Sequence, residues 1–253
     1  MPQPIESPQN PQFKRWRSLL DSRGMKKQGQ FLLSGRKTVP EALRRHPERF
    51  HALLFHSDEQ LAGLQQPPGL GCYRLARPLF AELDIIGTDA PLLVGSLPEF
   101  PAADLGAPPQ GLELICALGN PDNLGALLRS AAAFGARRVI LLEEAAHPFH
   151  PRALRAGANA QFELELAQGP GWAALAGAAG PMLALDARGE ALSEFSWPAN
   201  VRLVLGEEGQ GLPAALGVRR LSIPTTGAVE SLNATVAASL ALFSYYSARG
   251  RQL

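Results

Sequence analysis

Cysteine is scarce in this chain of 253 residues, which contains only Cys72 and Cys116. Both lie in apolar runs, LGCYRL and LELICAL, so the sequence predicts buried thiols and excludes a disulfide framework. The first residues lack the charged and then apolar pattern of a signal peptide, and no apolar run is long enough to cross a bilayer. We therefore expect a soluble, cytoplasmic protein in a reducing compartment.

Several common ligand-binding motifs are absent as well. No G-x-x-x-x-G-K-[ST] occurs, which excludes a P-loop NTPase. His147 and His150 have no Cys or carboxylate at metal-ligand spacing, so we expect them to shape a loop and no metal to be bound. The stretch 201–213, VRLVLGEEGQGLP, is spaced G-x-x-G-x-G and differs from the dinucleotide motif G-x-G-x-x-G.

The glycine-rich stretch also carries Glu207 and Glu208. Gly206, Gly209 and Gly211 would let the backbone approach a ligand closely. Two carboxylates repel a pyrophosphate and attract a cation, so this turn suits an adenosyl sulfonium better than NAD or ATP. An ordinary surface turn is the alternative interpretation.

Positive charge is concentrated near the N-terminus. Residues 1–50 contain 11 Lys/Arg and 4 Asp/Glu, whereas the remainder contains 13 and 19. Such asymmetry predicts a basic face for a polyanion. A solvated N-terminal arm without a partner is the alternative.

The first part of the chain has a mixed pattern. Residues 1–12 are rich in Pro and Gln and are expected to be disordered. Residues 13–30 suggest a short basic helix that is broken near Gly24, and FLLSGRKTVPEALRR suggests a strand, a turn and a helix. Further short strands are expected in FHALLFHS and GCYRLA. Four prolines mark 95–111 as the domain boundary.

After this boundary, apolar strands alternate with helices. Strands are expected in LELICAL, RRVILLE, QFELELA, PMLALDA, VRLVLG and RRLSIP, and helices in NLGALLRSAAAFG, PRALRAGANA, GWAALAGAAG and the C-terminal stretch. Continuous apolar strands alternating with helices predict an α/β fold with a parallel sheet covered on both faces.

Residues 117–136 form the first candidate site. The apolar residues of this segment are spaced as one helical stripe that would pack on the sheet: Leu124, Leu127, Leu128, Ala131 and Ala132. Gly125 and Arg129 lie off this stripe, four residues apart, so the guanidinium could pass over Gly125 toward Asn123. An arginine beside a helix N-terminus suits a phosphate. The alternative is that Asn123 caps the helix and Arg129 is a solvated charge.

The second candidate site is the stretch IPTTGAVESLN before the C-terminal helix. Pro224 ends a strand, and Gly227 permits a turn. Ser231 and Asn233 then stand at the start of the helix, where free backbone N–H groups also point. A helix cap needs only one such side chain, so the set contains more polar groups than capping requires. At the edge of a ligand-binding site, the same residues would supply hydroxyl, amide and backbone donors together.

Three segments resemble, in order, the three motifs of the SpoU/TrmH branch of the SPOUT methyltransferases. They are NPDNLGALLRSA, LVLGEEGQGL and SIPTTGAVESLNATVA, and the resemblance covers roughly residues 112–249. FLLSGRKTVPEAL is similar to the start of a small RNA-binding domain found ahead of this catalytic domain. The chain departs from the family at Asn120, where Asp is frequent, at TTG in the third motif, and at Thr235, where Ser is commoner.

The resemblance implies a fold and an activity. The fold would comprise a disordered tail (1–12), a small α/β RNA-binding domain (13–105) and a parallel-sheet domain (106–253) with a deep C-terminal trefoil knot. The activity would be methyl transfer from S-adenosylmethionine to a ribose 2′-hydroxyl of a structured RNA, rRNA rather than tRNA. The active unit would be a homodimer, with no membrane partner and no metal.

The resemblance also assigns residues to roles. Arg129 would act as a base or hold a phosphate, and a phosphate clamp is favoured because a guanidinium keeps its proton. The other catalytic residues would be Asn123, Glu208, Ser231 and Asn233. The cofactor would contact Leu205, Gly206, Gly211, Ile223, Pro224, Leu232 and Asn233. Arg155 matches a common family position for RNA contact, and the concentration of positive charge near the N-terminus adds further RNA-binding candidates: Lys14, Arg15, Arg17, Lys26, Lys27, Arg36 and Lys37.

Two other functions are weighed against this one. A non-catalytic RNA-binding protein on the same fold would use the basic N-terminal half and stacking on Trp16. A dinucleotide oxidoreductase is disfavoured by the glycine order, the acidic turn and the lack of an Asp or Glu at the later spacing.

Overall fold

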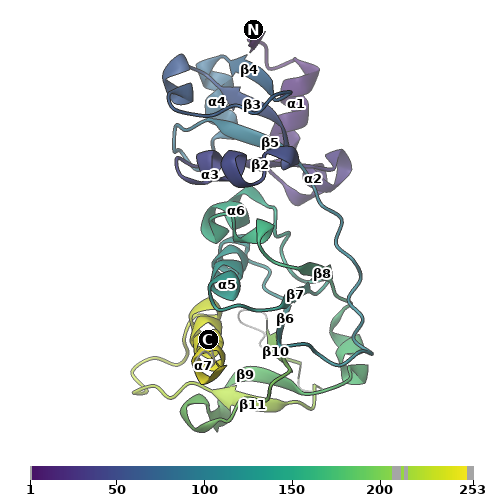
Figure 1. Ribbon diagram of the computed structural model, residues 1–253. Helices are drawn as coiled ribbons and strands as arrows, with labels where there is room; N and C mark the ends of the chain where they lie inside the picture. The colour runs from purple at the N-terminus through teal and green to yellow at the C-terminus, as the bar shows by residue number, and fades with distance from the viewer. Residues whose placement is uncertain (1, 207–211, 214–215, 250–253) are drawn as a thin grey trace. The chain divides into compact units, whose positions relative to one another are not determined.

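The chain forms two compact units in the computed structural model, which describes residues 2–206, 212–213 and 216–249 (Figure 1). Unit 1 comprises Met1–Glu99 and His147–Phe162, and unit 2 comprises Phe100–Ala146 and Glu163–Leu253. The sequence predicts one boundary, in 95–111. The chain also returns to unit 1 for residues 147–162, so each unit is assembled from two separate segments of the sequence.

Unit 1 is built on a mixed five-stranded sheet in the order β1-β4-β3-β5-β2. Its strands are β1 (Gln3–Ile5), β2 (Gln30–Leu33), β3 (Phe50–Phe55), β4 (Gly71–Leu75) and β5 (Leu92–Ser96). Its helices are α1 (Pro11–Ser18), α2 (Ser22–Gln28), α3 (Thr38–Arg45), α4 (Arg77–Leu83) and α6 (Pro151–Gly157). The expected strand, turn and helix in FLLSGRKTVPEALRR are therefore confirmed as β2 and α3.

The N-terminal segment differs from the expectation of disorder. Gln3–Ile5 pairs in parallel with β4, and Ile5 is buried. Pro4 is tolerated because β1 is an edge strand, where a missing N–H costs no ladder bond. Asn10 then caps α1 by accepting hydrogen bonds from Gln12 N and Phe13 N. One buried apolar side chain and one cap thus order a segment whose composition suggests a tail.

Two helices replace the one expected in residues 13–30. The break lies between Ser18 and Ser22, where Asp21 caps α2 by accepting from Gly24 N at 2.8 Å. Gly24 itself is inside α2 and buried, and a Cβ there would lie 1.8 Å from Ser18 O. Gly24 is therefore required for close helix packing, and it does not break the helix.

The segment 147–162 joins unit 1 through an aromatic cluster. Phe31 of β2 contacts Phe149 edge-on, with ring centroids 4.9 Å apart, and Phe50 and Phe162 complete the group. Asn159 donates to Thr38 O at 3.0 Å and so ties the segment to α3. These contacts are long-range in sequence, which explains why periodicity does not reveal the return.

Unit 2 is built on a six-stranded parallel sheet in the order β11-β9-β10-β6-β7-β8. Its strands are β6 (Leu112–Cys116), β7 (Arg138–Leu141), β8 (Leu166–Gln168), β9 (Met182–Ala191), β10 (Val201–Leu205) and β11 (Arg219–Ser222). Its α-helices are α5 (Pro121–Ala133) and α7 (Ala234–Arg249), which pack side by side (Figure 1). The predicted α/β fold with a parallel sheet is confirmed.

Three predicted elements of the second half differ in the structure. Trp172–Gly177 is a short 3-10 helix where a longer helix is expected. In QFELELA the strand begins only at Leu166, after a 3-10 turn at Ala160–Phe162. The apolar run 234–246 predicts a C-terminal helix that is buried on most sides, but this helix exposes Val236, Leu240 and Phe243. This spacing places the three side chains on one face.

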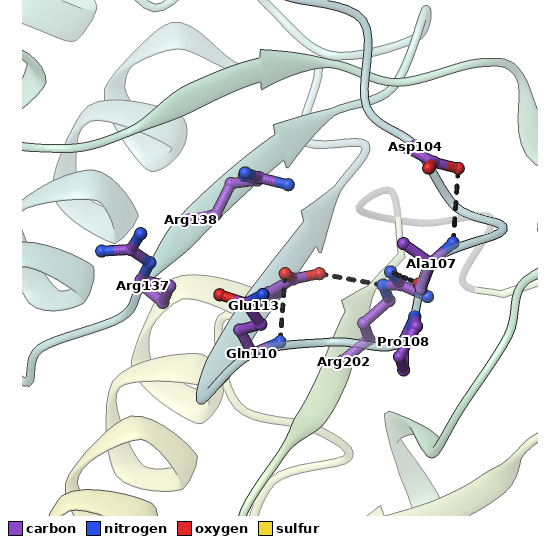
Figure 2. A pocket seen from close by; sticks show the side chains of 8 residues that line it. All are labelled: Asp104, Ala107, Pro108, Gln110, Glu113, Arg137, Arg138 and Arg202. Carbon is purple, nitrogen blue, oxygen red and sulfur yellow. Dashed lines mark hydrogen bonds and ion pairs between the residues drawn. The ribbon is translucent and has the colours of Figure 1, made fainter.

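A buried ion pair fixes the loop that leads into β6. Arg202 of β10 donates from Nε to Glu113 Oε2 at 3.0 Å, and both side chains are almost fully buried (Figure 2). The same guanidinium donates to the backbone carbonyls of Leu105, Ala107 and Ala179. A cavity of about 200 Å³ lies beside the pair, at the end of the sheet where β6 and β10 begin. Because the Arg202 guanidinium also satisfies these carbonyls, we assign its ion pair with Glu113 a structural role.

Candidate functional site

The three motif segments follow β6, β10 and β11 of unit 2. β6 and β10 are neighbours, and Ala117 N donates to Leu205 O at 3.3 Å where the two strands end. In parallel sheets, ligands bind beyond the carboxyl ends of the strands. The first two motifs therefore emerge side by side at the edge where a binding site is expected.

The first motif opens α5, which begins with a cap and a proline. The Oδ1 atom of Asn120 accepts from Asp122 N at 2.9 Å and from Asn123 N at 3.3 Å, and Pro121 occupies the first turn. The alternative in which Asn123 caps the helix is therefore wrong, because Asn120 fills that role. This leaves the Asn123 side chain, which is half-buried, for contacts outside its own helix.

The third motif reaches α5 through Asn233. Its Oδ1 atom accepts from Thr235 N at 2.9 Å and from Val236 N at 3.2 Å, which caps α7. Its Nδ2 atom donates to Asn123 Oδ1 in a long hydrogen bond of 3.5 Å. The hydroxyl of Thr235 also donates to the backbone carbonyl of Asn123, at 3.0 Å. The structure thus brings together two predicted site residues that are 110 positions apart.

Arg129 lies on α5 with its side chain exposed. It makes no ion pair with any residue in 2–206, 212–213 or 216–249. Gly125, one turn earlier, is buried, and the apolar stripe of Leu124, Leu127 and Leu128 faces the core as predicted. An exposed guanidinium six residues after Asn123 on the same helix can receive an anionic ligand from solvent. Its route over Gly125 toward Asn123 stays a prediction.

The predicted cofactor residues lie at the ends of β10 and β11 and before α7. Leu205 is buried at the end of β10, whereas Gly206, Ile223 and Leu232 are half-buried. Pro224 and Ser231 are exposed, and Gly227 has a φ of 79°, which favours glycine. Glu208 and Gly211 lie outside the described residues, as do Glu207 and Gly209.

The predicted RNA-binding residues all belong to unit 1 and are all exposed: Lys14, Arg15, Arg17, Lys26, Lys27, Arg36, Lys37 and Arg155. Unit 1 contains 15 Lys/Arg and 10 Asp/Glu, whereas unit 2 contains 9 and 13. Arg17 pairs with Glu82 at 3.4 Å, so part of its charge is neutralised. The positive charge of the protein is thus carried by unit 1.

Trp16 is not available for stacking on RNA. The side chain is fully buried and packs edge-on against Tyr73, with ring centroids 4.9 Å apart. Phe13, one turn earlier on α1, is also fully buried. The apolar face of α1 therefore belongs to the core, and only its cations reach solvent. This removes the aromatic contact on which the non-catalytic alternative relies.

The two histidines of HPFHP shape a loop, as expected. His150 accepts from Arg152 N through Nδ1 at 3.2 Å and caps α6, and His147 accepts from Phe149 N at 3.1 Å. Burial, with smaller contributions from Lys26 and His150, lowers the pKa of His147 to about 4. Within the described part of the chain, no group of three or more His, Cys, Asp or Glu is arranged to hold a metal ion. The same residues include no helix with the length and apolar character needed to cross a bilayer.

Two residues near the site were not singled out by the sequence. The hydroxyls of Ser130 on α5 and Ser239 on α7 lie 2.7 Å apart, and Ser239 also donates to Thr235 O at 2.7 Å. Thr235 stood out only as a departure from the family pattern. A more useful indication is that Thr235 and Ser239 are four residues apart in the mostly apolar first half of the helix, which places both hydroxyls on one face.

Comparison with known proteins identifies relatives over nearly the whole chain. A model of the SpoU rRNA Methylase family matches residues 114–243. Ribosomal RNA small subunit methyltransferase G 2 of Syntrophobacter fumaroxidans is 40% identical over 95% of this chain, which spans 48% of that relative's length. The 23S rRNA (guanosine(2553)-2′-O)-methyltransferase RlmP of Bacillus subtilis is 29% identical, over 94% of this chain and 97% of the relative.

A solved structure has the same fold. The SpoU methyltransferase AviRb of Streptomyces viridochromogenes, crystallised in complex with the cofactor AdoMet, superposes with a TM-score of 0.78. The match covers 95% of this chain and 98% of that chain at 24% sequence identity. At this identity the likeness establishes the fold.

Proposed function

Because the chain belongs to the SpoU rRNA Methylase family, we propose that it transfers a methyl group from S-adenosylmethionine to a ribose 2′-hydroxyl of a structured RNA. The observation that carries the proposal is the contact of Asn123 with Asn233, which joins the first and third motifs at one edge of the sheet. The ribose as acceptor is supported by the 2′-O activity in the name of the B. subtilis relative.

The residues near this edge fit S-adenosylmethionine, which supplies an electrophilic methyl group when bound. Ile223 and Leu232 are half-buried apolar side chains that could contact an adenine. Gly206 presents backbone without a side chain where β10 ends, and Ser231 is an exposed hydroxyl beside Asn233. An apolar wall with a polar rim is the usual construction of a cofactor site. Glu208 and Gly211 are proposed to complete it from the second motif.

Arg129 is proposed to hold the RNA phosphate next to the reacting ribose. Its guanidinium is exposed, and a guanidinium in water keeps its proton, so it binds a phosphate better than it removes a proton. Asn123, held by Asn233, would orient the ribose or the arginine. Aligning the acceptor oxygen is a substantial part of the task, because correct positioning alone removes several kcal/mol from a barrier.

Unit 1 is proposed to bind the RNA through its exposed cations. Lys26 and Lys27 lie in the last turn of α2, and Arg36 and Lys37 lie in the loop before α3. Phosphate contacts of this kind supply affinity and carry no sequence information by themselves. An rRNA substrate is favoured over tRNA because both named relatives act on, or are named for, ribosomal RNA.

A homodimer is proposed to be the active form, through unit 2. Val236, Leu240 and Phe243 are 50%, 42% and 53% exposed and share one face of α7. Large apolar side chains grouped on one face mark a surface that another chain covers. The C-terminal trefoil knot, through which α7 would pass, is likewise proposed from the family.

The proposal is tested by transfer of a labelled methyl group into transcribed rRNA and tRNA, followed by alkaline hydrolysis. A methylated 2′-oxygen cannot attack the neighbouring phosphate, so the label should appear in an alkali-stable dinucleotide. Label in a single nucleotide would place the methyl group on a base and contradict the ribose assignment. Calorimetry with S-adenosylmethionine addresses the non-catalytic alternative, which predicts no binding.

A further inference from the structure

The contact between α5 and α7 contains three hydroxyl groups that no motif role accounts for, those of Ser130, Thr235 and Ser239. Ser239 donates to Thr235 O at 2.7 Å, so its single proton is used. Ser130 must therefore be the donor in the 2.7 Å contact between the two serine hydroxyls. Thr235 donates its own proton to Asn123 O at 3.0 Å. All three protons are thereby committed, and two separate hydrogen bonds link the helices, from Ser130 to Ser239 and from Thr235 to Asn123.

These two interhelical hydrogen bonds supply a directional constraint that the surrounding packing lacks. The buried residues around it are apolar, among them Leu127 and Leu128 on α5 and Ala238 and Leu242 on α7. Apolar contacts are non-directional and allow two helices to shift along each other. A hydrogen bond is lost when its atoms separate by much more than ~3 Å or lose alignment. Thr235, which is 7% exposed, therefore sets the register of the two helices.

The register matters because Asn123 and Asn233 flank the Thr235 contact. Asn233 lies two residues before Thr235, and its Oδ1 atom is committed to capping α7. Its Nδ2 atom therefore points at Asn123 only while α7 keeps its present position on α5. The 3.5 Å separation of Asn233 Nδ2 and Asn123 Oδ1 is already at the limit of a hydrogen bond, so a small shift would break it.

We propose that Thr235 is a positioning residue, which acts with Ser239 and Ser130 to hold Asn123 and Asn233 at one site. Thr235 touches neither reactant in this account and acts only through the two asparagines. The inference rests on the proposed methyl transfer for its functional consequence. Its structural part, the register of α7 on α5, stands without that function.

The decisive variants are Thr235→Val and Thr235→Ser. Valine keeps the branched shape and removes the donor, whereas serine keeps the donor. We expect Thr235→Val to lower kcat at least ~10-fold, because ångström-scale misplacement of reacting groups is costly. The KM for RNA should stay within about twofold of the wild-type value, since unit 1 is untouched, and Thr235→Ser should restore most of kcat.

Ser244→Ala is the matched control, because it removes another hydroxyl from α7. Ser244 accepts from Trp197 Nε1 at 3.0 Å and lies five residues beyond Ser239, away from Asn123. The Ser244→Ala variant should be less stable than the wild-type protein and should keep the wild-type kcat. The proposal is overturned if Thr235→Val keeps the wild-type kcat, if serine fails to rescue it, or if Ser244→Ala loses kcat to the same extent.

A second measurement separates this inference from the proposed function. The side-chain amide resonances of Asn123 and Asn233 report their contact whether or not any RNA is methylated. They should shift in Thr235→Val and return toward their original positions in Thr235→Ser. Unchanged resonances in the valine variant would refute the positioning role. Shifted resonances in a protein without transferase activity would uphold the register and refute the proposed function.

Discussion

His147 couples the stability of unit 1 to pH. Burial lowers its pKa to about 4, with smaller contributions from Lys26 and His150, so the ring is neutral in the folded protein at pH 6. In the unfolded chain a histidine titrates near ~6.5. Below that pH the unfolded state takes up a proton that the folded state excludes. The free energy of unfolding should therefore fall as the pH is lowered from about 6.5 to about 4.

The His147→Asn variant tests this linkage while keeping an acceptor for Phe149 N. At pH 4.5 the wild-type protein should lose about 2 kcal/mol more of its unfolding free energy, relative to pH 7, than the variant does. Urea unfolding followed by Trp16 fluorescence, with Trp172 and Trp197 replaced by Phe, reports on unit 1. Equal losses in the two proteins would show that His147 is not the titrating group.

Among the elements, α5 depends on its cap. Asn120 accepts from two backbone N–H groups in the first turn and so sets where the helix begins. Asn120→Ala should lower the free energy of unfolding by about 1 kcal/mol, because those N–H groups lose their acceptor. Asn120→Asp should retain the stability, since a carboxylate caps equally well and suits the positive helix N-terminus. Urea unfolding of unit 2 distinguishes the two, and an unstable Asp variant would contradict this account.

The elements that the sequence predicts correctly are those with local causes. The buried strands β6 and β10 are short runs that are apolar apart from the paired Glu113 and Arg202, and α5 combines a cap, a proline and a buried stripe. The return of residues 147–162 to unit 1 depends on Phe31 meeting Phe149, which no local pattern encodes. Trp16 resembles an exposed aromatic among cations until the sheet that buries it is known.

The same distinction applies to the candidate site. Asn123, Arg129 and Asn233 could be chosen from the sequence because they stand at strand and helix ends in recognisable motifs. The roles of Asn120 and Thr235 could not, because each depends on which of several adjacent polar residues turns toward a partner. The structure resolves this for Asn120 through two hydrogen bonds and for Thr235 through one.

At the scale of the whole molecule, the apolar face of α7 predicts association. Replacing Leu240 and Phe243 together by Glu places two charges where an apolar partner surface is expected. The dissociation constant of the proposed homodimer should rise by roughly 100-fold or more, as at interface hot spots. Sedimentation velocity over a range of concentrations measures this change.

The control for association is Ile85→Glu, because Ile85 is 46% exposed and lies in unit 1. It introduces one carboxylate of the same kind at an apolar surface position outside α7 and should leave the association state unchanged. A wild-type protein that stays monomeric at every concentration would contradict the homodimer. Equal dissociation in both variants would show that α7 is not the interface.

The charge of the molecule is divided between its units in a way that suits the proposed function. Unit 1 has an excess of cations, and unit 2, which holds the motif segments, has an excess of carboxylates. A polyanion is therefore attracted to the first unit and repelled by most of the second. Arg129 is an exposed cation within this acidic unit, on the helix that carries Asn123. Its position therefore supports a role in attracting the RNA to the motif segments.

The most direct test of the central claim is the rate of methyl transfer by Arg129→Ala, measured beside the affinity for S-adenosylmethionine. The variant should lose transfer by roughly 100-fold or more, because a group that positions the reactants is removed. Its affinity for the cofactor should stay within about twofold, and Arg188→Ala, at another exposed arginine of unit 2, should keep both. If Arg129→Ala methylates RNA at the wild-type rate, the assignment of this site is wrong.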